Sequence, residues 1–221
     1  YPKMPYDSLR DITPIAVVAE TPFLLVVNPR KLPVSNAKEL VALLKAKPDT
    51  ISYASAGKGT APHLAAELFQ INTGTQMLHV PYKGSAPAIV DTIGGTTQVM
   101  FPSLFSAYPQ VAGGKLKALG IAGEKRSSVL PNVPTLKEQG IPNMNVTQWY
   151  ALFAPAKTPK PIIEKLNAAL NKALTAPDVR QRLQELGATP EPGSPEKMRD
   201  FATAEVKRWR EVVKASGAKA E

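Results

Sequence analysis

The stretch that decides the fold reads Tyr53-Ala54-Ser55-Ala56-Gly57-Lys58-Gly59-Thr60-Ala61-Pro62-His63. It predicts a short strand that ends in a glycine-rich turn and continues into a helix. The first N–H groups of a helix have no intrahelical acceptor, so this turn is typical of an anion-binding site. Ser55 and Thr60 add hydroxyl donors, and Gly57 and Gly59 allow a ligand to approach the backbone closely. The alternative interpretation is a plain βα turn in which Thr60 caps the helix.

This turn is not a phosphate-binding P-loop, because Lys58 is followed by glycine and not by Ser or Thr. A second turn, Val80-Pro81-Tyr82-Lys83-Gly84-Ser85, repeats the strand-to-helix arrangement. Ligands of open α/β sheets gather outside the carboxyl ends of strands, so both turns are predicted to face one crevice. Lys83 would supply positive charge there; alternatively it is a solvated surface lysine.

Strands and helices alternate on both sides of these turns. Predicted strands cover residues 13–19, 22–28, 51–54, 77–80, 98–101, 116–122 and 146–154. Predicted helices cover residues 36–47, 61–72, 86–93, 134–139, 160–175, 178–186 and 195–215, with a short helical turn at 104–112. The alternation favours an α/β fold with a mostly parallel sheet. The apolar run at 23–27 predicts a strand covered on both faces, and Asn36 with Glu39 resembles a capping box.

Composition excludes several classes of protein. The 221 residues contain 27 Lys or Arg and 18 Asp or Glu, a net charge of +9, with no cysteine. Without cysteine there are no disulfides, no thiol catalysis and no Cys-ligated metal centre. The basic residues are scattered and aromatics make up only 6%, which argues against nucleic acid and favours a diffuse field that attracts small anions. The apolar runs are far shorter than the about 20 residues of a membrane span, and no signal peptide is visible.

The residues show no reactive cluster. His63 and His79 have no partner at metal-ligand spacing, so we predict no metal site and interpret each as a buried or capping histidine. No Gly-x-Ser-x-Gly nucleophile elbow is present, although a catalytic triad does not require that motif. Trp149 and Tyr150 are predicted to pack in the core or hinge; the alternative is an aromatic wall of a ligand cleft.

The chain resembles the periplasmic solute receptors of tripartite tricarboxylate transporters, the Bug family. The resemblance is carried by Pro81-Tyr82-Lys83-Gly84, by Pro87-Ala88 and Gly94-Gly95, and then by Gly114-Lys115-Leu116-Lys117-Ala118-Leu119. Further matching stretches lie at residues 1–6, 14, 21–29, 53–69, 80–95, 114–122, 126–140 and 149–155, in the family's order.

The resemblance implies a two-lobed, type II periplasmic-binding-protein fold, a member of the α/β class. The lobes would close on a small organic carboxylate in the periplasm and present it to a membrane permease. Residues 1–20 and the crossing strand and helices at 147–221 would belong to lobe 1, and residues 21–146 to lobe 2. The family implies neither an enzyme activity nor a cofactor, and we expect a monomer for the full-length protein.

In the family, two loops hold one ligand carboxylate, and one of these loops matches residues 55–63. We therefore expect the carboxylate to contact one set of residues, namely Ser55, Gly57, Thr60, Ala61 and His63. We expect Lys83, Gly84 and Ser103 to line the other wall. Val27 and Trp149 are expected near the crossing segments.

The sequence departs from the family in two places. The family's chain begins before the position of Tyr1, so we expect the first lobe to be incomplete and to lack a Pro-Gly-Gly ligand loop. Gln98 and Pro102 stand where relatives often carry acidic residues, which favours a plain carboxylate ligand over an amino acid. Two other functions stay open: a regulatory receptor whose closed form docks on a sensor kinase, and an enzyme on a similar scaffold.

Overall fold

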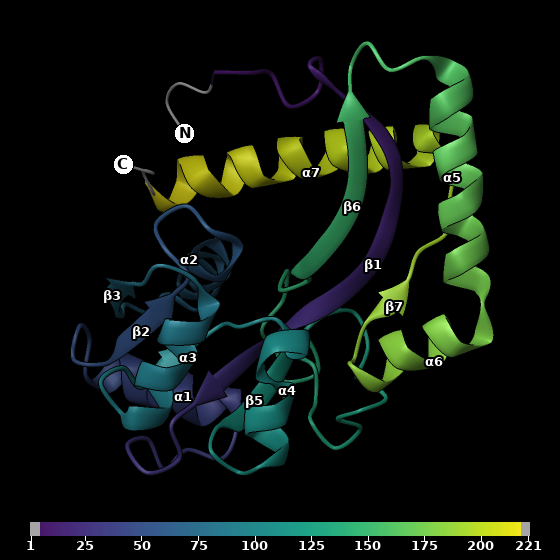
Figure 1. Ribbon diagram of the computed structural model, residues 1–221. Helices are drawn as coiled ribbons and strands as arrows, with labels where there is room; N and C mark the ends of the chain where they lie inside the picture. The colour runs from purple at the N-terminus through teal and green to yellow at the C-terminus, as the bar shows by residue number, and fades with distance from the viewer. Residues whose placement is uncertain (1–4, 218–221) are drawn as a thin grey trace.

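The strand β1 (Ile12–Val27) takes part in two sheets. The computed structural model describes residues 5–217, and Figure 1 shows β1 running as one long curved ribbon from one part of the molecule to the other. Up to Pro22 it pairs antiparallel with β6 (Thr147–Pro155) and β7 (Thr189–Pro190). From Phe23 onward it pairs antiparallel with β5 (Lys117–Ala122) and β4 (Val99–Met100).

The prediction of two separate strands at 13–19 and 22–28 is wrong. The segment between them stays extended, with Pro22 opposite Thr147 in the last pair of the β1–β6 ladder. The next residue already continues the strand, since the Phe23 N–H donates to Val146 O at 3.1 Å. A proline has no N–H to donate to a neighbouring strand. Pro22 stands where β1 stops pairing with β6 and begins to pair with β5, so no hydrogen bond between strands is lost there.

The second sheet is mixed, not mostly parallel as predicted. Its strand order is β3-β2-β4-β1-β5. β2 (Ser52–Ser55) is parallel to β3 (Leu78–Pro81) and to β4, but β1 is antiparallel to both of its neighbours. Helical crossovers keep β2, β3 and β4 parallel to one another. β1 instead enters from the first sheet, which it forms with β6 and β7, and runs antiparallel to its neighbours β4 and β5.

Helices cover both faces of the second sheet (Figure 1). α1 (Ala37–Ala46) and α2 (Ala61–Thr73) pack with Phe23, Leu25 and Val27. α3 (Ser85–Gly94) and α4 (Leu104–Ala112) pack with the alternating residues Leu24 and Val26. All five β1 side chains are 0% exposed, which confirms the predicted strand covered on both faces.

Three C-terminal helices follow β6: α5 (Lys160–Thr175), α6 (Pro177–Glu185) and α7 (Pro195–Ser216). α5 and α7 contact β1, and α7 also contacts α2. Figure 1 shows α7 crossing behind β1 and β6 and ending above α2. Among residues 5–217, no helix has the length and apolar character needed to cross a membrane.

The helix predicted at residues 134–139 does not form. Thr135 instead makes a parallel bridge with Ile121: the Ile121 N–H donates to Pro134 O and the Leu136 N–H donates to Ile121 O, at 3.0 and 2.9 Å. Because Pro134 O and the Leu136 N–H bond to β5, they are not available for helical hydrogen bonds, and the segment forms a series of turns.

Candidate functional site

Three parallel strands end side by side at one edge of the second sheet, and each leads into a helix. Ala54 and Ser55 of β2 pair with Met100 of β4 and Pro81 of β3. β2 leads into α2, β3 into α3 and β4 into α4, so the three helix N-termini meet at this edge. The Tyr82 N–H donates to Ser55 O at 3.0 Å and the Gly84 N–H donates to Ala56 O at 3.1 Å. The two turns therefore lie together, as predicted.

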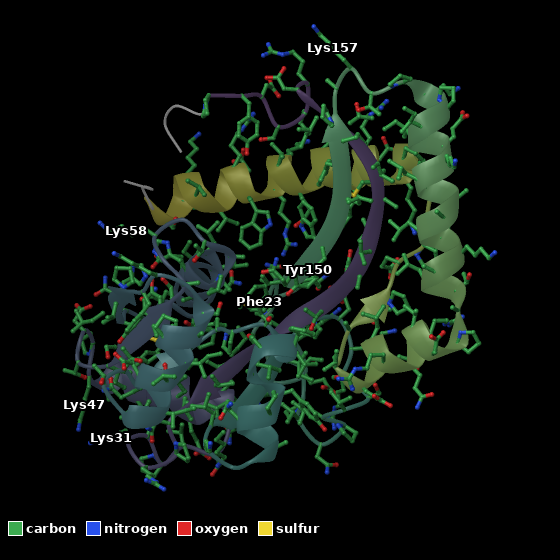
Figure 2. All side chains as sticks on the ribbon, viewed as in Figure 1. Phe23, Lys31, Lys47, Lys58, Tyr150 and Lys157 are labelled. Atoms are coloured by element: carbon green, nitrogen blue, oxygen red, sulfur yellow. The ribbon has the colours of Figure 1, made fainter. Side chains whose placement is uncertain are left out.

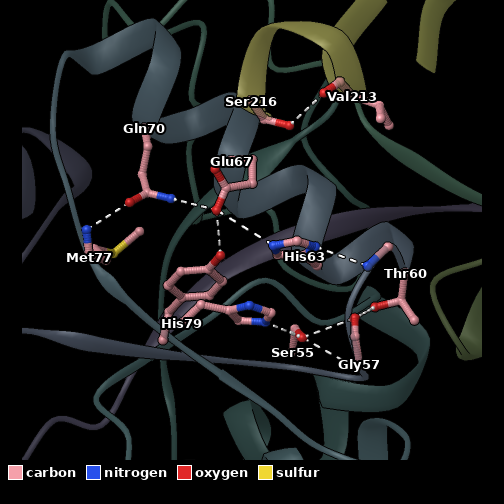
Figure 3. Close-up of polar contacts among 12 residues, drawn as sticks. Ser55, Gly57, Thr60, His63, Glu67, Gln70, Met77, His79, Val213 and Ser216 are labelled. Atoms are coloured by element: carbon pink, nitrogen blue, oxygen red, sulfur yellow. Dashed lines mark hydrogen bonds and ion pairs between the residues drawn. The ribbon is translucent and has the colours of Figure 1, made fainter. Parts of the chain in front are cut away.

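The loop between β2 and α2 is held by its own hydrogen bonds (Figure 3). Ser55 Oγ accepts from the Gly57 N–H at 3.1 Å, and Thr60 Oγ1 donates to Gly57 O at 2.7 Å. Gly57 has φ of +130°, and a Cβ there would lie 3.2 Å from Tyr82 O, so the loop requires glycine at this position. Thr60 stands at the N-cap of α2, as in the alternative interpretation, but its side chain makes no cap bond, because the hydroxyl donates back to Gly57 O in the loop.

The first turn of α2 presents its backbone to this edge. Its N-cap is Thr60, and Ala61, Pro62 and His63 follow. Pro62 has no N–H, and the N–H groups of Ala61 and His63 have no intrahelical acceptor. Together with the positive end of the helix dipole, these groups suit a carboxylate.

The two histidines, His63 and His79, lie together behind the loop between β2 and α2. The rings of His63 and His79 stack with centroids 4.1 Å apart and planes 7° from parallel, and Tyr53 stacks on His79 at 4.8 Å. His79 Nε2 lies 2.6 Å from Ser55 Oγ. Burial lowers the pKa of His79 to about 4, helped by neighbouring His63 and Lys58, so the imidazole is neutral at pH 7. Burial likewise lowers the pKa of His63, although Glu67 opposes this shift.

Glu67 is a member of this cluster that the sequence analysis missed. Its Oε1 accepts from Tyr53 Oη at 2.6 Å and from Gln70 Nε2 at 3.1 Å, and lies 3.6 Å from His63 Nε2. The available signal was the spacing: residues 63 and 67 are four apart on one helix and therefore share a face. Burial and the bond to Glu67 raise the pKa of Tyr53.

The other predicted residues lie where the chain enters α3 and α4. Lys83 is exposed, and Gly84 has φ of +113° at the N-cap of α3. Ser103 is the N-cap of α4 and is 9% exposed, with its Oγ 3.0 Å from Ser106 Oγ. Ser103 also bridges Phe23 of β1, which places it beside the crossing strand.

The two neighbouring aromatic residues of β6 point to opposite faces, as successive strand residues do. Trp149 packs edge-on against Phe201 of α7 at 5.6 Å between ring centroids. Tyr150 is 44% exposed and meets Phe105, in the first turn of α4, at 6.4 Å. Figure 2 places Tyr150 and Phe23 where the chain passes between the sheets. Phe105 was missed because its place beside β6 follows only from the tertiary structure.

Two expected placements are wrong. Val27 is not near the crossing segments; it is fully buried at the far end of β1, opposite Val99 and Lys117. Gln98 is not near the predicted site, because it precedes β4 and its Oε1 accepts from the Ser52 N–H at 2.8 Å, at the opposite edge. Pro102, in contrast, follows β4 at the site edge, where its carbonyl accepts from the Leu24 N–H.

β1 passes through both sheets, and three helix N-termini gather at one edge of the second sheet. This fold closely matches solved structures of the class of periplasmic solute-binding proteins. Within this class, the model of the tripartite tricarboxylate transporter family receptor matches residues 1–218. The chain belongs to this family.

Relatives and solved structures agree with this assignment. The chain is 38% identical to protein BugT of Bordetella pertussis over 99% of its own length and 67% of BugT. It is 39% identical to the UPF0065 protein in the tcbD-tcbE intergenic region of Pseudomonas sp. (strain P51), over 96% of this chain and 63% of that protein. The chain thus spans about two thirds of the length of these relatives.

Two similar structures carry carboxylates. Rpa4515 of R. palustris, solved with adipate, matches with a TM-score of 0.94 and 33% identity, over 100% of this chain and 74% of that one. MatC (Rpa3494) of Rhodopseudomonas palustris, solved with bound malate, matches with a TM-score of 0.88 and 34% identity, over 96% and 73%.

Proposed function

We propose that the protein is a periplasmic receptor that binds a small dicarboxylate and delivers it to the permease of a tripartite tricarboxylate transporter. The observation that carries this proposal is the meeting of three helix N-termini at one sheet edge, with two of their loops joined by backbone hydrogen bonds. The adipate and malate bound to similar proteins support the ligand class. As in other binding proteins, ligand contacts made only in a closed form would drive closure.

In this proposal, the loop after β2 holds one carboxylate through backbone and hydroxyl donors. Gly57, Thr60 and Ala61 lie at the loop and the first turn of α2. Ser55 is fully buried and supports the loop through its bonds to Gly57. Gly84, Ser103 and the charge of Lys83 form the other wall, and Tyr150 adds an exposed aromatic face beside α4.

A plain dicarboxylate is favoured over an amino acid. The segments 55–63, 80–87 and 101–106 contain no Asp or Glu but include Lys58 and Lys83. A ligand ammonium group would therefore find no acidic partner in these loops, whereas a second carboxylate would meet positive charge. The division into lobes that close on the ligand, residues 1–20 with 147–221 and residues 21–146, is part of the same proposal.

The test is a titration of the purified protein with malate, adipate, succinate, glutamate and an aromatic acid, followed by calorimetry and thermal melts. A dicarboxylate at one hundred times its dissociation constant should stabilise the fold by about 2.7 kcal/mol, a rise in Tm of several degrees. A melt that no acid shifts contradicts carboxylate binding. A preference for glutamate over succinate contradicts the proposed ligand class alone.

Lys83→Gln should weaken dicarboxylate binding by a factor of about two to five, since an exposed charge pair contributes little. Lys47→Gln is the matched control, because it removes the same charge from an exposed lysine at the C-cap of α1. Figure 2 shows that Lys47 lies far from Tyr150. Equal effects of the two substitutions would mean that Lys83 acts only through net charge.

A further inference from the structure

His63 was expected to contact the ligand, but both of its ring nitrogens already have protein partners. Its Nδ1 accepts from the Gly59 N–H at 3.0 Å, and its Nε2 lies 3.6 Å from Glu67 Oε1. One ring face is covered by His79, and the residue is only 6% exposed. Figure 3 shows the ring between Glu67 on one side and the loop on the other. The imidazole therefore reaches a ligand only through the loop.

We propose that His63 is the positioning residue of the anion-binding loop, which it holds through the Gly59 N–H, and that ligand binding requires its imidazole to be neutral. This inference rests on the proposed function. It assigns one tautomer: Nδ1 must lack a proton to accept from Gly59, so the ring proton is on Nε2 and points to Glu67. Tyr53 and Gln70 hold Glu67 in place from its other sides.

The loop is held at several points along its length, and the bond to His63 is the one that holds Gly59. Ser55 anchors Gly57, and the Thr60 hydroxyl closes the turn onto the Gly57 carbonyl. Gly59 has φ of +74° and is anchored by His63. A proton on Nδ1 would set two N–H donors against each other about 3 Å apart, and the Gly59 end of the loop would lose its anchor just before the first turn of α2.

The groups around His63 determine the pH at which its ring gains this proton. The groups that face it are Glu67 on its own helix, Lys58 in the loop, His79 on β3 and Tyr53 on β2. From α7, which packs against α2, Figure 3 shows Val213 and Ser216 near this cluster, and neither is charged. Burial lowers the pKa of His63, Lys58 adds to this, and Glu67 opposes it. The ring is therefore neutral at pH 7 and gains its proton only on acidification.

Two substitutions separate the acceptor from the ring. His63→Phe keeps a stacked ring against His79 but offers no acceptor to Gly59. His63→Asn gives up the ring, but its amide oxygen takes a position close to that of Nδ1 and does not titrate. With adipate and malate as probes at pH 8, we expect roughly tenfold weaker binding for the Phe variant, as for a buried donor left unpaired, and at most threefold weaker binding for the Asn variant.

The pH dependence provides a readout that a merely structural role would not move. Between pH 8 and pH 5.5, the wild type should lose affinity more steeply than the Asn variant, since the ligand's own protonation is common to both. Glu67→Gln keeps an oxygen acceptor but removes the negative charge that favours the imidazolium. It should therefore shift the loss of affinity to lower pH. Parallel pH profiles for wild type and the Asn variant, or unchanged affinity in the Phe variant, would overturn the proposal.

Nitrogen NMR of the ligand-free protein tests the same inference without any ligand. At pH 8 the His63 signals should show an unprotonated Nδ1 and a protonated Nε2, and the Gly59 amide proton should exchange faster in the Phe variant than in the wild type. A protonated Nδ1 overturns the proposal. If neither probe binds the wild type, the proposed dicarboxylate function fails, and the NMR measurement still decides the role of His63.

Discussion

The stacked imidazoles behind the β2–α2 loop make the free energy of unfolding depend on pH. Burial lowers the pKa of His79 in the folded protein to about 4, against about 6.5 in an unfolded chain. Between these values the unfolded chain binds a proton that the folded chain does not. Stability therefore falls as the pH decreases through this window and is complete above about pH 6.5.

We expect His79→Gln to reduce this dependence, because glutamine offers Ser55 a partner close to the position of Nε2 but does not titrate. Between pH 7 and pH 5, the wild type should lose about 1 kcal/mol more than the variant, once solvent screening of this half-buried ring is allowed for. Thermal melts of both proteins at each pH measure this difference. Carboxylates elsewhere titrate equally in both, so equal losses would show that His79 contributes nothing.

Thr60 is the second residue with a specific role, since its hydroxyl closes the loop onto Gly57 O at 2.7 Å. Thr60→Ala should weaken dicarboxylate binding by about 1 kcal/mol, the size of one lost hydrogen bond. Thr60→Ser keeps the hydroxyl and is the control for the lost methyl group. Calorimetric titration measures the difference, and an unchanged affinity in the alanine variant would remove Thr60 from the site.

Among the elements, α1 begins where its cap predicts. Asn36 Oδ1 accepts from the Glu39 N–H at 2.9 Å. The Glu39 carboxylate returns to the Ser35 N–H at 2.6 Å and not to the N–H of the cap residue itself. The helix then buries Ala37, Leu40 and Leu44 against the second sheet.

Asn36→Ala should lower the free energy of unfolding by about 1 kcal/mol, since alanine leaves the Glu39 N–H without its acceptor. Ser35→Ala is the matched control, because Ser35 contributes its backbone N–H to this box and keeps it after the substitution. Urea denaturation of the two variants measures the effect. A loss of the same size in both would mean that the side chain of Asn36 does not cap the helix.

At the scale of the whole molecule, α7 contacts both sheets. Met198, Phe201 and Ala202 pack with Val17 and Trp149 of the first sheet. Further along, Trp209 packs against the core of the second sheet, and the Arg208 guanidinium donates to Asn145 O in the segment before β6. α7 therefore contacts both parts of the molecule and adds to the link made by β1, the strand that both sheets share (Figure 1).

Trp209→Ala should destabilise the protein by about 2 kcal/mol, less than a fully buried tryptophan because the ring is only partly covered. This corresponds to a decrease in Tm of about 4–8 °C for a chain of this size. Val206→Ala, at a position 37% exposed on the same helix, should change the Tm by less than about 2 °C. Equal decreases in Tm for the two variants would mean that the loss comes from helix propensity and not from the contact of Trp209 with the core of the second sheet.

Local patterns determined most elements and one edge of the sheet. The strand at 23–27, the helix at 160–175 and the two glycine-rich turns follow from apolar runs, caps and turn residues, which act over a few neighbours along the chain. Since helical crossovers make β2, β3 and β4 parallel, the meeting of the turns at 55–60 and 80–85 also followed from sequence.

Other features depended on contacts between residues far apart in the chain. β1 is continuous through Pro22 because Thr147 and Val146 lie beside it, and residues 134–139 give up a helix because Thr135 bridges Ile121. The same holds for the stack of His63 on His79 and the contact of Phe105 with Tyr150. A local pattern states which groups a segment can offer, but only the packed chain decides which partner satisfies each hydrogen bond and covers each ring.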